Sequence, residues 1–302
     1  MSVVVVGTVA LDTVATPETT RHDQLGGSAS YASLSASYFS PVHMVSIVGN
    51  DFPHEYLSLF QQRGIDTASV QVVEGGTFRW SGKYFEDMNH RETHSVAVNV
   101  LEHFQPRLAD NARQARIALL ANCSPDNQLA TLDQVEKPDF VISDSMDLWI
   151  EIARERLLDV LTRSDLFVIN DDEAKMFMET KNTVVAGRKL LQLGPRHVVV
   201  KKGEHGALLF GPDGQFFSAG AYPLAEVQDP TGAGDCFVGG LAGYLSSLHK
   251  KDITFADLAR GIVHGTVLAS FNCESFSTDR LKSLTRDELD LRAAEIARFS
   301  SI

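Results

Sequence analysis

The residues best suited to chemistry lie in one short run, Asp229–Asp235, which reads Asp-Pro-Thr-Gly-Ala-Gly-Asp. The proline and the two glycines interrupt regular structure, and apolar residues at spacings of three and four from Ala233 to Leu245 predict a helix directly after them. The first N–H groups of a helix lack intrahelical partners and lie at the positive end of the helix dipole. This run, which we call the 229–235 turn, is therefore suited to hold a phosphate group.

Asp235 needs a separate explanation, because a carboxylate repels phosphate. It could accept a proton from an incoming hydroxyl while the N–H groups of the turn hold a transferring phosphoryl group. The alternative is that Asp235 only complements the helix dipole, which is worth about 0.3–1 kcal/mol. For an isolated Gly-x-Gly-Asp the alternative would be favoured, so the choice depends on the longer pattern.

The complete turn resembles the C-terminal motif of the ribokinase-like (PfkB) family of sugar and nucleoside kinases. The resemblance implies that Asp235 is the catalytic base and that the amides of Gly232, Ala233 and Gly234 form the anion hole. Other phosphate-binding loops fit less well. No Gly-x-x-x-x-Gly-Lys-Ser/Thr occurs, and Phe237 stands where a dinucleotide fingerprint requires glycine.

The N-terminal segments resemble the acceptor-binding parts of the same family. Asp12 follows the buried-strand pattern Val3–Val6, and in the family the Asp at this place holds substrate hydroxyls; a lone Asp after a strand is otherwise a turn residue. Gly26 and Gly27 resemble the di-glycine motif that lets the substrate approach the backbone. Tyr31 stands where many members carry an Asn that reads sugar hydroxyls, so the acceptor stays open between a sugar and a nucleoside.

Several later residues resemble the parts of the family that contact ATP and its metal. Glu173 ends an Asn-x-x-Glu pattern that organises Mg²⁺ in the family, although the same pattern is an ordinary helix cap. Asp144, at the end of a predicted strand, is the second metal candidate, or else a turn residue. The Gly-x-x-Gly turn after the strand His197–Lys201 borders the nucleotide in the family, and the adenine lies beside a later helix. The resulting candidates for ATP binding are Asn170, Lys201, Gly203, Gly206, Thr231 and His264.

Short apolar strands alternate with helical patterns along most of the chain, which predicts a mostly parallel sheet with helices on both faces. The resemblance implies a ribokinase-like three-layer α/β/α fold in a single domain, residues 1–302. The predicted strands are Val3–Val6, Val42–Val48, Ile117–Ala121, Phe140–Asp144, Leu166–Asn170, His197–Lys201 and Ala207–Phe210. The predicted helices include Ser28–Phe39, His54–Arg63, Trp149–Leu161, Asp171–Glu179, Thr254–Phe271 and Arg286–Phe299.

The segment from about 70 to 100 differs from the rest, because it is rich in aromatic and alternating residues and lacks helical patterns. It is either an antiparallel edge of the main sheet or, as its position in the resembled family implies, a small β lid over the substrate. In the second case Arg79 and Trp80 are candidates to contact the acceptor. The aromatic residues Phe78, Trp80 and Tyr31 could stack a nucleobase.

Composition narrows the class of protein. The formal charge of −12 and the pI near 5.2 argue against nucleic-acid and anionic-membrane surfaces. Cys123, Cys236 and Cys273 are far apart and form no Cys-x-x-Cys, so neither a disulfide framework nor structural zinc is expected. No signal peptide or membrane span is expected either, which fits a cytoplasmic protein.

Together these patterns predict an enzyme that transfers phosphate from ATP, with Mg²⁺, to a hydroxyl of a small sugar or sugar-like molecule. One alternative is a nucleoside kinase of the same family. The other is a non-catalytic binder of a sugar phosphate or nucleotide, which is disfavoured because a binder gains nothing from Asp235. A requirement for a monovalent cation such as K⁺ and a homodimer through the lid stay open.

Overall fold

The computed structural model describes residues 1–299, so the predicted domain of 1–302 ends outside the described residues. In that part a nine-stranded sheet runs in the order β13-β12-β11-β10-β9-β8-β1-β4-β5. All neighbours from β11 to β5 are parallel, while β12 and β13 pair antiparallel at one edge. The strands are β1 (Val3–Val6), β4 (Val42–Gly49), β5 (Ile65–Val73), β8 (Ile117–Leu120), β9 (Phe140–Asp144), β10 (Leu166–Asn170), β11 (His197–Lys201), β12 (Ala207–Phe210) and β13 (Phe216–Ala219).

The central strand β1 shows why four consecutive valines form a strand and not one turn of a helix. Val3 and Val5 pack into the core on one face of the sheet, and Val4 and Val6 pack into the core on the other. Successive side chains of a strand point to opposite faces, so a strand covered on both sides needs apolar residues at every position.

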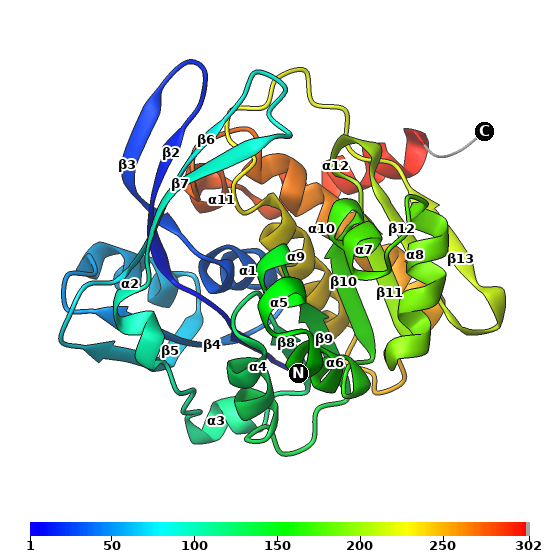
Figure 1. Ribbon diagram of the computed structural model, residues 1–302, viewed down its shortest axis with the longest axis horizontal. Coiled ribbons are helices and arrows are strands. Elements are labelled where there is room, and N and C mark those ends of the chain that lie inside the picture. Colours follow the sequence, from blue (N-terminus) through cyan, green and yellow to red (C-terminus); the bar gives the residue numbers. More distant parts are fainter. Residues whose placement is uncertain (300–302) are drawn as a thin grey trace.

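Helices cover both faces of this sheet, which confirms the predicted three-layer arrangement (Figure 1). One face carries α1 (Ser28–Ala36), α2 (His54–Gln62), α9 (Ala233–Ser247), α10 (Phe255–Asn272), α11 (Asp279–Ser283) and α12 (Arg286–Phe299). The other carries α3 (Asp110–Arg113), α4 (Pro125–Leu132), α5 (Asp147–Ile152), α6 (Arg154–Thr162), α7 (Asp171–Phe177) and α8 (Thr183–Leu190). No helix in the described part of the chain has the length and apolar character needed to cross a membrane.

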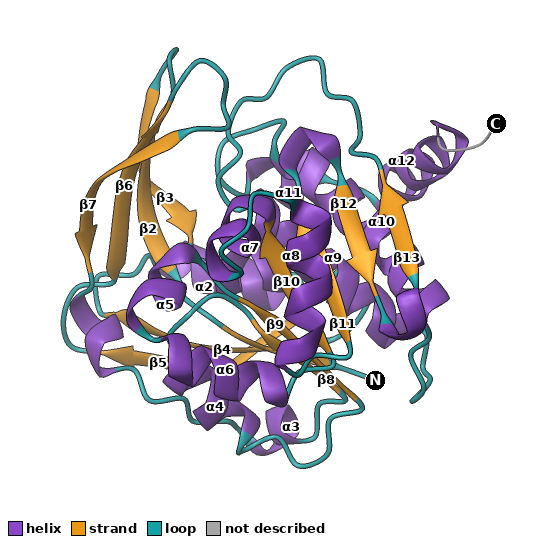
Figure 2. Cartoon of the chain, turned by 45° about the vertical axis from the view of Figure 1, so that its right-hand side comes forward, coloured by secondary structure: helices purple, strands orange, loops and turns teal. Residues whose placement is uncertain are grey.

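A second sheet of four strands, which we call the lid, rises from the side of the large sheet that carries β4 and β5 (Figures 1 and 2). Its order is β3-β2-β6-β7, with β2 and β6 parallel and the other pairs antiparallel. The strands are β2 (Ala10–Ala15), β3 (Thr20–Gly26), β6 (Phe78–Tyr84) and β7 (Arg91–Ala97).

The lid differs from the segment of about 70–100 that the sequence predicted. Residues 10–26 supply half of its strands, and β5, which overlaps the predicted segment, belongs to the large sheet. The N-terminal half was missed because β3 begins with exposed polar residues and shows no apolar alternation. The predicted helix Trp149–Leu161 is also corrected: it is divided into α5 and α6 at Ala153, whose φ of −138° is not helical.

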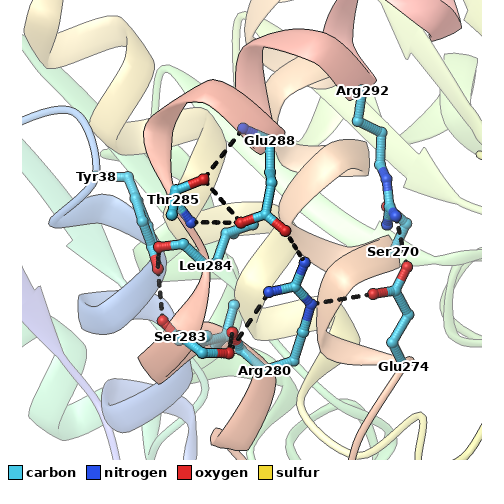
Figure 3. Close-up of polar contacts among 10 residues, drawn as sticks. Tyr38, Ser270, Glu274, Arg280, Ser283, Leu284, Thr285, Glu288 and Arg292 are labelled. Carbon is cyan, nitrogen blue, oxygen red and sulfur yellow. Dashed lines mark hydrogen bonds and ion pairs between the residues drawn. The ribbon is translucent and has the colours of Figure 1, made fainter.

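A polar network attaches the C-terminal helices to the body of the protein (Figure 3). The Arg280 guanidinium donates to Glu274 and Glu288, and Arg292 donates to Glu274 at 2.5 Å. The Tyr38 hydroxyl donates to the carbonyl of Leu284 at 3.0 Å, which joins the end of α1 to the segment between α11 and α12. These bonds fix the helices that flank α10, which in turn packs against α9.

Candidate active site

The 229–235 turn is held in shape by Asp229, whose side chain is fully buried. Its Oδ1 accepts the backbone N–H of Thr231 at 2.9 Å, and its Oδ2 accepts that of Ser277 at 3.1 Å. Gly232 has a φ of 78°, and a Cβ at this position would overlap the ring of Tyr31. The turn therefore requires glycine at 232 both for its left-handed backbone and for its contact with the aromatic ring.

That contact places Tyr31 beneath the turn, whereas the sequence predicted that it contacts the acceptor. The side chain is 2% exposed and belongs to the core beneath the turn, so it supports Gly232 and is not positioned to stack a base. Tyrosine at this position is explained by packing.

Helix α9 begins directly after Gly232, as predicted, and directs the N–H groups of its first turn out of the helix. The N–H of Ala233 donates to the carbonyl of Pro230 at 3.1 Å. Of the three residues predicted to form the anion hole, Gly232, Ala233 and Gly234, only Ala233 already donates its N–H group within the turn. The N–H groups of Gly234 and Asp235, in the first turn, lack intrahelical acceptors and are available for an anion.

Asp235 lies in this first turn among other charged groups. Although part of its surface stays accessible, burial and the nearby Asp144 raise the pKa of Asp235 to about 7, while Lys201 and Arg91 act in the opposite direction. A carboxyl group with a pKa near neutrality can take up a proton from a hydroxyl and release it again. The structure thus places a carboxyl group of raised pKa at a helix end that presents unpaired N–H groups.

Asp12 lies within strand β2 of the lid and not in a loop after β1, as the sequence suggested. Burial raises its pKa to about 8, and the charges of Asp229 and Asp235 add to the effect. Its Oδ1 is buried and, within the described residues, has no hydrogen-bond partner. A Cβ at Gly26 would overlap the Asp12 carboxyl group, so this glycine makes room for it. Gly27 has a φ of 90° and caps the start of α1.

The strand register of the lid determines which side chains share a face. Asp12 on β2 lies beside Trp80 on β6, and Trp80 lies opposite Val96 on β7. Paired residues project to the same face of a sheet, so these three side chains form a row on the face that carries Asp12. Arg79, the neighbour of Trp80, projects to the opposite face, where it forms salt bridges with Asp23 and Asp51. The predicted acceptor contacts Trp80 and Arg79 are therefore separated.

The predicted Asn170–Glu173 pair forms a capping box at the start of α7. The Asn170 side chain accepts the N–H of Glu173 at 2.8 Å, and Glu173 Oε2 accepts the N–H of Asn170 at 3.0 Å. Burial raises the pKa of Glu173 to about 7; Lys201 counteracts this shift and Asp144 adds to it. The pair thus stabilises the start of α7, and the Glu173 carboxyl group also interacts electrostatically with Lys201 and Asp144.

Asp144, at the end of β9, forms a buried ion pair with Lys201, at the end of β11. Lys201 Nζ donates to the two carboxylate oxygens of Asp144 at 3.3 and 3.4 Å. A Cβ on Gly234 would lie 3.1 Å from the same Nζ, so Lys201 lies next to the 229–235 turn. The structure therefore brings Lys201 to the candidate site, and it gives Asp144 an ammonium partner. Among the described residues, no three His, Cys, Asp or Glu side chains are arranged to hold a metal ion.

The predicted ATP contacts Gly203, Gly206 and His264 lie at different distances from the 229–235 turn. Gly203 and Gly206, with φ of 54° and 81°, form the tight turn between β11 and β12, adjacent to Lys201. His264 stacks on Tyr244 with ring centroids 4.3 Å apart. Tyr244 lies 12 residues beyond Gly232 on α9, about 18 Å along the helix at 1.5 Å per residue. His264 is therefore a packing residue far from the turn.

Three residues that contact the turn were not predicted as site residues: Tyr84, Asn272 and Ser277. The Thr231 hydroxyl donates to the Tyr84 hydroxyl of the lid at 3.3 Å, and the carbonyl of Thr231 accepts from Asn272 at 2.8 Å. Ser277 holds Asp229, as described above. Only the Asp-x-Thr spacing carried a local signal, since it is typical of an Asx turn; the partners come from distant segments.

The sequence of this chain was compared with those of known protein families. The pattern of the pfkB family carbohydrate kinases matches residues 2–283. The chain belongs to this family. The three-layer fold with a second, smaller sheet agrees with this membership.

Individual relatives act on different acceptors. The chain is 29% identical over 250 residues to a cytidine kinase of Thermococcus kodakarensis, covering 81% of this chain and 88% of that protein. It is 26% identical over 229 residues to a 2-dehydro-3-deoxygluconokinase of Thermoproteus tenax, covering 70% and 68%. Among solved structures, the fold matches a nucleoside kinase of Burkholderia thailandensis in complex with inosine, with a TM-score of 0.79, 20% identity and coverage of 97% and 96%.

Proposed function

We propose that this pfkB-family protein transfers the γ-phosphoryl group of ATP to a hydroxyl of a nucleoside. The observation that carries the kinase reaction is the position of Asp235, with a pKa of about 7, in the first turn of α9 beside the unpaired N–H groups. Asp235 takes the proton of the acceptor hydroxyl, the freed oxygen attacks the γ-phosphorus, and the bond to ADP breaks. The N–H groups of Gly234 and Asp235 stabilise the negative charge of the phosphoryl group in transit.

The lid supports a nucleoside as the acceptor. Asp12 has a buried oxygen without a protein partner, which suits a ribose hydroxyl. Trp80 and Val96 continue the same row across the lid and add an apolar surface next to that carboxyl group. A nucleobase can lie on this surface, and stacking of a base on an aromatic ring is worth about 1–3 kcal/mol. The similarity to a cytidine kinase adds support.

The residues present also fit Mg²⁺ accompanying ATP, in part. Glu173 uses one oxygen for its cap, and burial raises the pKa of its carboxyl group, an effect that a cation at this carboxyl group would oppose. Asp144 fits less well, because Lys201 already neutralises it. Mg²⁺ would screen the charge between the phosphates and needs only one or two protein carboxylates, since it retains waters and phosphate oxygens as ligands.

The test is release of ADP with a panel of acceptors at equal concentration: cytidine, uridine, adenosine, inosine, ribose and 2-dehydro-3-deoxygluconate. We expect kcat/KM for at least one nucleoside to exceed that for ribose by about 10–100-fold, the value of base stacking. Turnover of the sugar acid alone would contradict the nucleoside proposal and keep the kinase. No turnover of any acceptor, by a folded protein that binds ATP, would contradict both.

A further inference from the structure

A cleft of about 550 Å³ lies at the amino ends of the strands whose carboxyl ends carry the candidate active site. Phe140 begins β9, Asp165 directly precedes β10, and His197 begins β11, and all three residues line the cleft. Lys201, at the other end of β11, is four residues from His197, or about 13 Å along a strand. The cleft is therefore separate from the candidate active site.

The buried part of the cleft is aromatic and contains one polar atom without a partner. Phe140, His197 and Phe255 line it, and the ring centroids of His197 and Phe255 are 6.2 Å apart. His197 is 3% exposed, and its buried Nδ1 has no hydrogen-bond partner among the described residues. Burial lowers the pKa of His197 to about 4, so at neutral pH the ring has one donor and one acceptor nitrogen. Such a ring can bind a polar group of a ligand in the cleft.

Asp165 adds a hydrogen-bond acceptor near this ring. Its Oδ2 accepts the backbone N–H of Val141 at 2.8 Å, while no described residue donates to its Oδ1. Aromatic rings together with a few polar atoms are the usual lining of a small-molecule site, and a volume of about 300–1,000 Å³ is typical. A nucleobase matches this lining, because its faces stack on aromatic rings and its edges carry donors and acceptors.

Two exposed cations that line the cleft, Arg196 and Lys251, have no ion-pair partner. The neighbouring Lys250 forms a salt bridge with Asp257, whereas neither Arg196 nor Lys251 forms one with any residue that the structure describes. Arg196 also acts on the buried part of the cleft: burial raises the pKa of Asp165, and the charge of Arg196 opposes that shift. Guanidinium and ammonium groups donate charge-assisted hydrogen bonds to phosphate oxygens.

The same opening contains two exposed carboxylates, Asp213 and Asp252, so its four unpaired charges sum to zero. Free phosphate is therefore not attracted by a net positive field. A phosphate group that is attached to a base held in the aromatic part can still reach the two cations by direct contact. The lining thus favours a ligand that carries both groups.

We propose that this cleft is a second ligand site, which binds a nucleoside monophosphate. The base lies against the rings of His197 and Phe255 and hydrogen-bonds to His197 and Asp165, and the phosphate binds Arg196 and Lys251. A nucleoside monophosphate is also the product of the reaction proposed above, but the cleft can bind it whichever acceptor the enzyme uses. The site goes beyond the proposed function and does not depend on it.

The experiment is a calorimetric titration of the whole chain with AMP, CMP, ribose 5-phosphate and inorganic phosphate. Arg196→Glu reverses a charge at the opening, and we expect it to weaken binding of AMP or CMP by about tenfold or more. His197→Phe keeps a ring but removes the nitrogens, and it should weaken the same nucleotide by about threefold or more. Lys189→Glu is the matched control, because Lys189 is exposed on α8 and does not line the cleft; it should match wild type.

The variants also separate the cleft from the active site, which can bind the same nucleotides. Binding of AMP and CMP that is unchanged in Arg196→Glu and His197→Phe would be binding at the active site only and would overturn the proposal. An equal loss in Lys189→Glu would overturn it too, as would ribose 5-phosphate or phosphate that binds as tightly as the nucleotides. If wild type phosphorylates no acceptor, the proposed function fails, and these titrations still decide the role of the cleft.

A second measurement locates the ligand without relying on weakened binding. In protein labelled with ¹³C at histidine rings, the His197 signal is identified by its absence from His197→Phe. We expect AMP or CMP to shift this signal in wild type and equally in Asp235→Asn, whose change lies at the active site. A His197 signal that stays unchanged at saturating nucleotide would overturn the proposal.

Discussion

The pKa of Asp235 is set by opposing electrostatic effects. Burial and Asp144 favour its neutral form, and Lys201 and Arg91 favour its charged form, with the result that its pKa is raised to about 7. A base with a pKa near the working pH combines a useful fraction of the deprotonated form with enough basicity to accept a proton. Since the deprotonated form is required, kcat/KM should increase as the pH rises through about 7.

Replacing Asp235 by Asn tests this role directly. The amide keeps the shape of the side chain but accepts no proton at neutral pH, so we expect kcat to fall by about 10²–10⁴-fold. ATP affinity should stay the same or improve, because a negative charge near the phosphates is removed. The measurement is steady-state ADP release by a variant with a wild-type melting temperature. Turnover within threefold of wild type would remove Asp235 from catalysis.

Asp12 allows a test that separates hydrogen bonding from charge. With a pKa of about 8 it is mostly protonated at neutral pH, so it both donates and accepts, as an amide does. We expect Asp12→Ala to weaken acceptor binding by about 1–3 kcal/mol, the cost of unpaired hydrogen-bonding groups. Asp12→Asn should lose much less, and neither variant should change ATP affinity. Calorimetry showing normal acceptor binding by Asp12→Ala would exclude this assignment.

At the scale of elements, the lid combines strands from two distant parts of the chain into one surface. Residues 10–26 contribute Asp12, and residues 78–97 contribute Trp80, Tyr84 and Arg91. The lid is joined to the 229–235 turn through the bond between Thr231 and Tyr84. Its face therefore extends from Asp12 to the 229–235 turn.

Trp80→Ala tests the acceptor end of this element. Loss of the stacking surface should raise the acceptor KM by about 10-fold or more while the KM for ATP changes little. Phe85→Ala is the matched control, because Phe85 is an exposed aromatic at the end of β6 and removes a similar area from the lid. Equal effects on both substrates, or in both variants, would indicate that Trp80 only stabilises the lid.

At the scale of the whole molecule, buried histidines make the fold sensitive to acid. Burial lowers the pKa of His197 and of His264 to about 4, from 6.5 for the unperturbed side chain. Between these values the unfolded chain binds more protons than the folded one, so stability is complete above pH 6.5 and is lost as the pH falls toward 4. Asp12, with its raised pKa, contributes a slope of the opposite sign.

The contribution of His197 can be isolated by His197→Phe, which keeps an aromatic ring beside Phe255. We expect the melting temperature of wild type to fall more steeply between pH 6.5 and pH 5 than that of the variant. Identical slopes would show that His197 binds its proton equally in both states. The comparison within one pair of proteins cancels the carboxylates common to both.

Much of the architecture follows from local sequence patterns. The valines of β1, the alternation of strands and helices, and the glycines and Asp235 of the 229–235 turn predicted the three-layer fold and the helix start at α9. These features depend on the spacing of apolar residues and on backbone freedom at glycine, which neighbouring residues are enough to reveal.

The tertiary structure alone decided which of these residues meet. Tyr31 packs under Gly232, His264 stacks on Tyr244, and Arg79 is separated from Trp80 by the two faces of one strand. Whether a lid residue faces the site depends on the register between β6 and its two neighbours, of which β2 lies far from it in the chain. A shift of one residue in that register would reverse every side chain, and no local pattern encodes it.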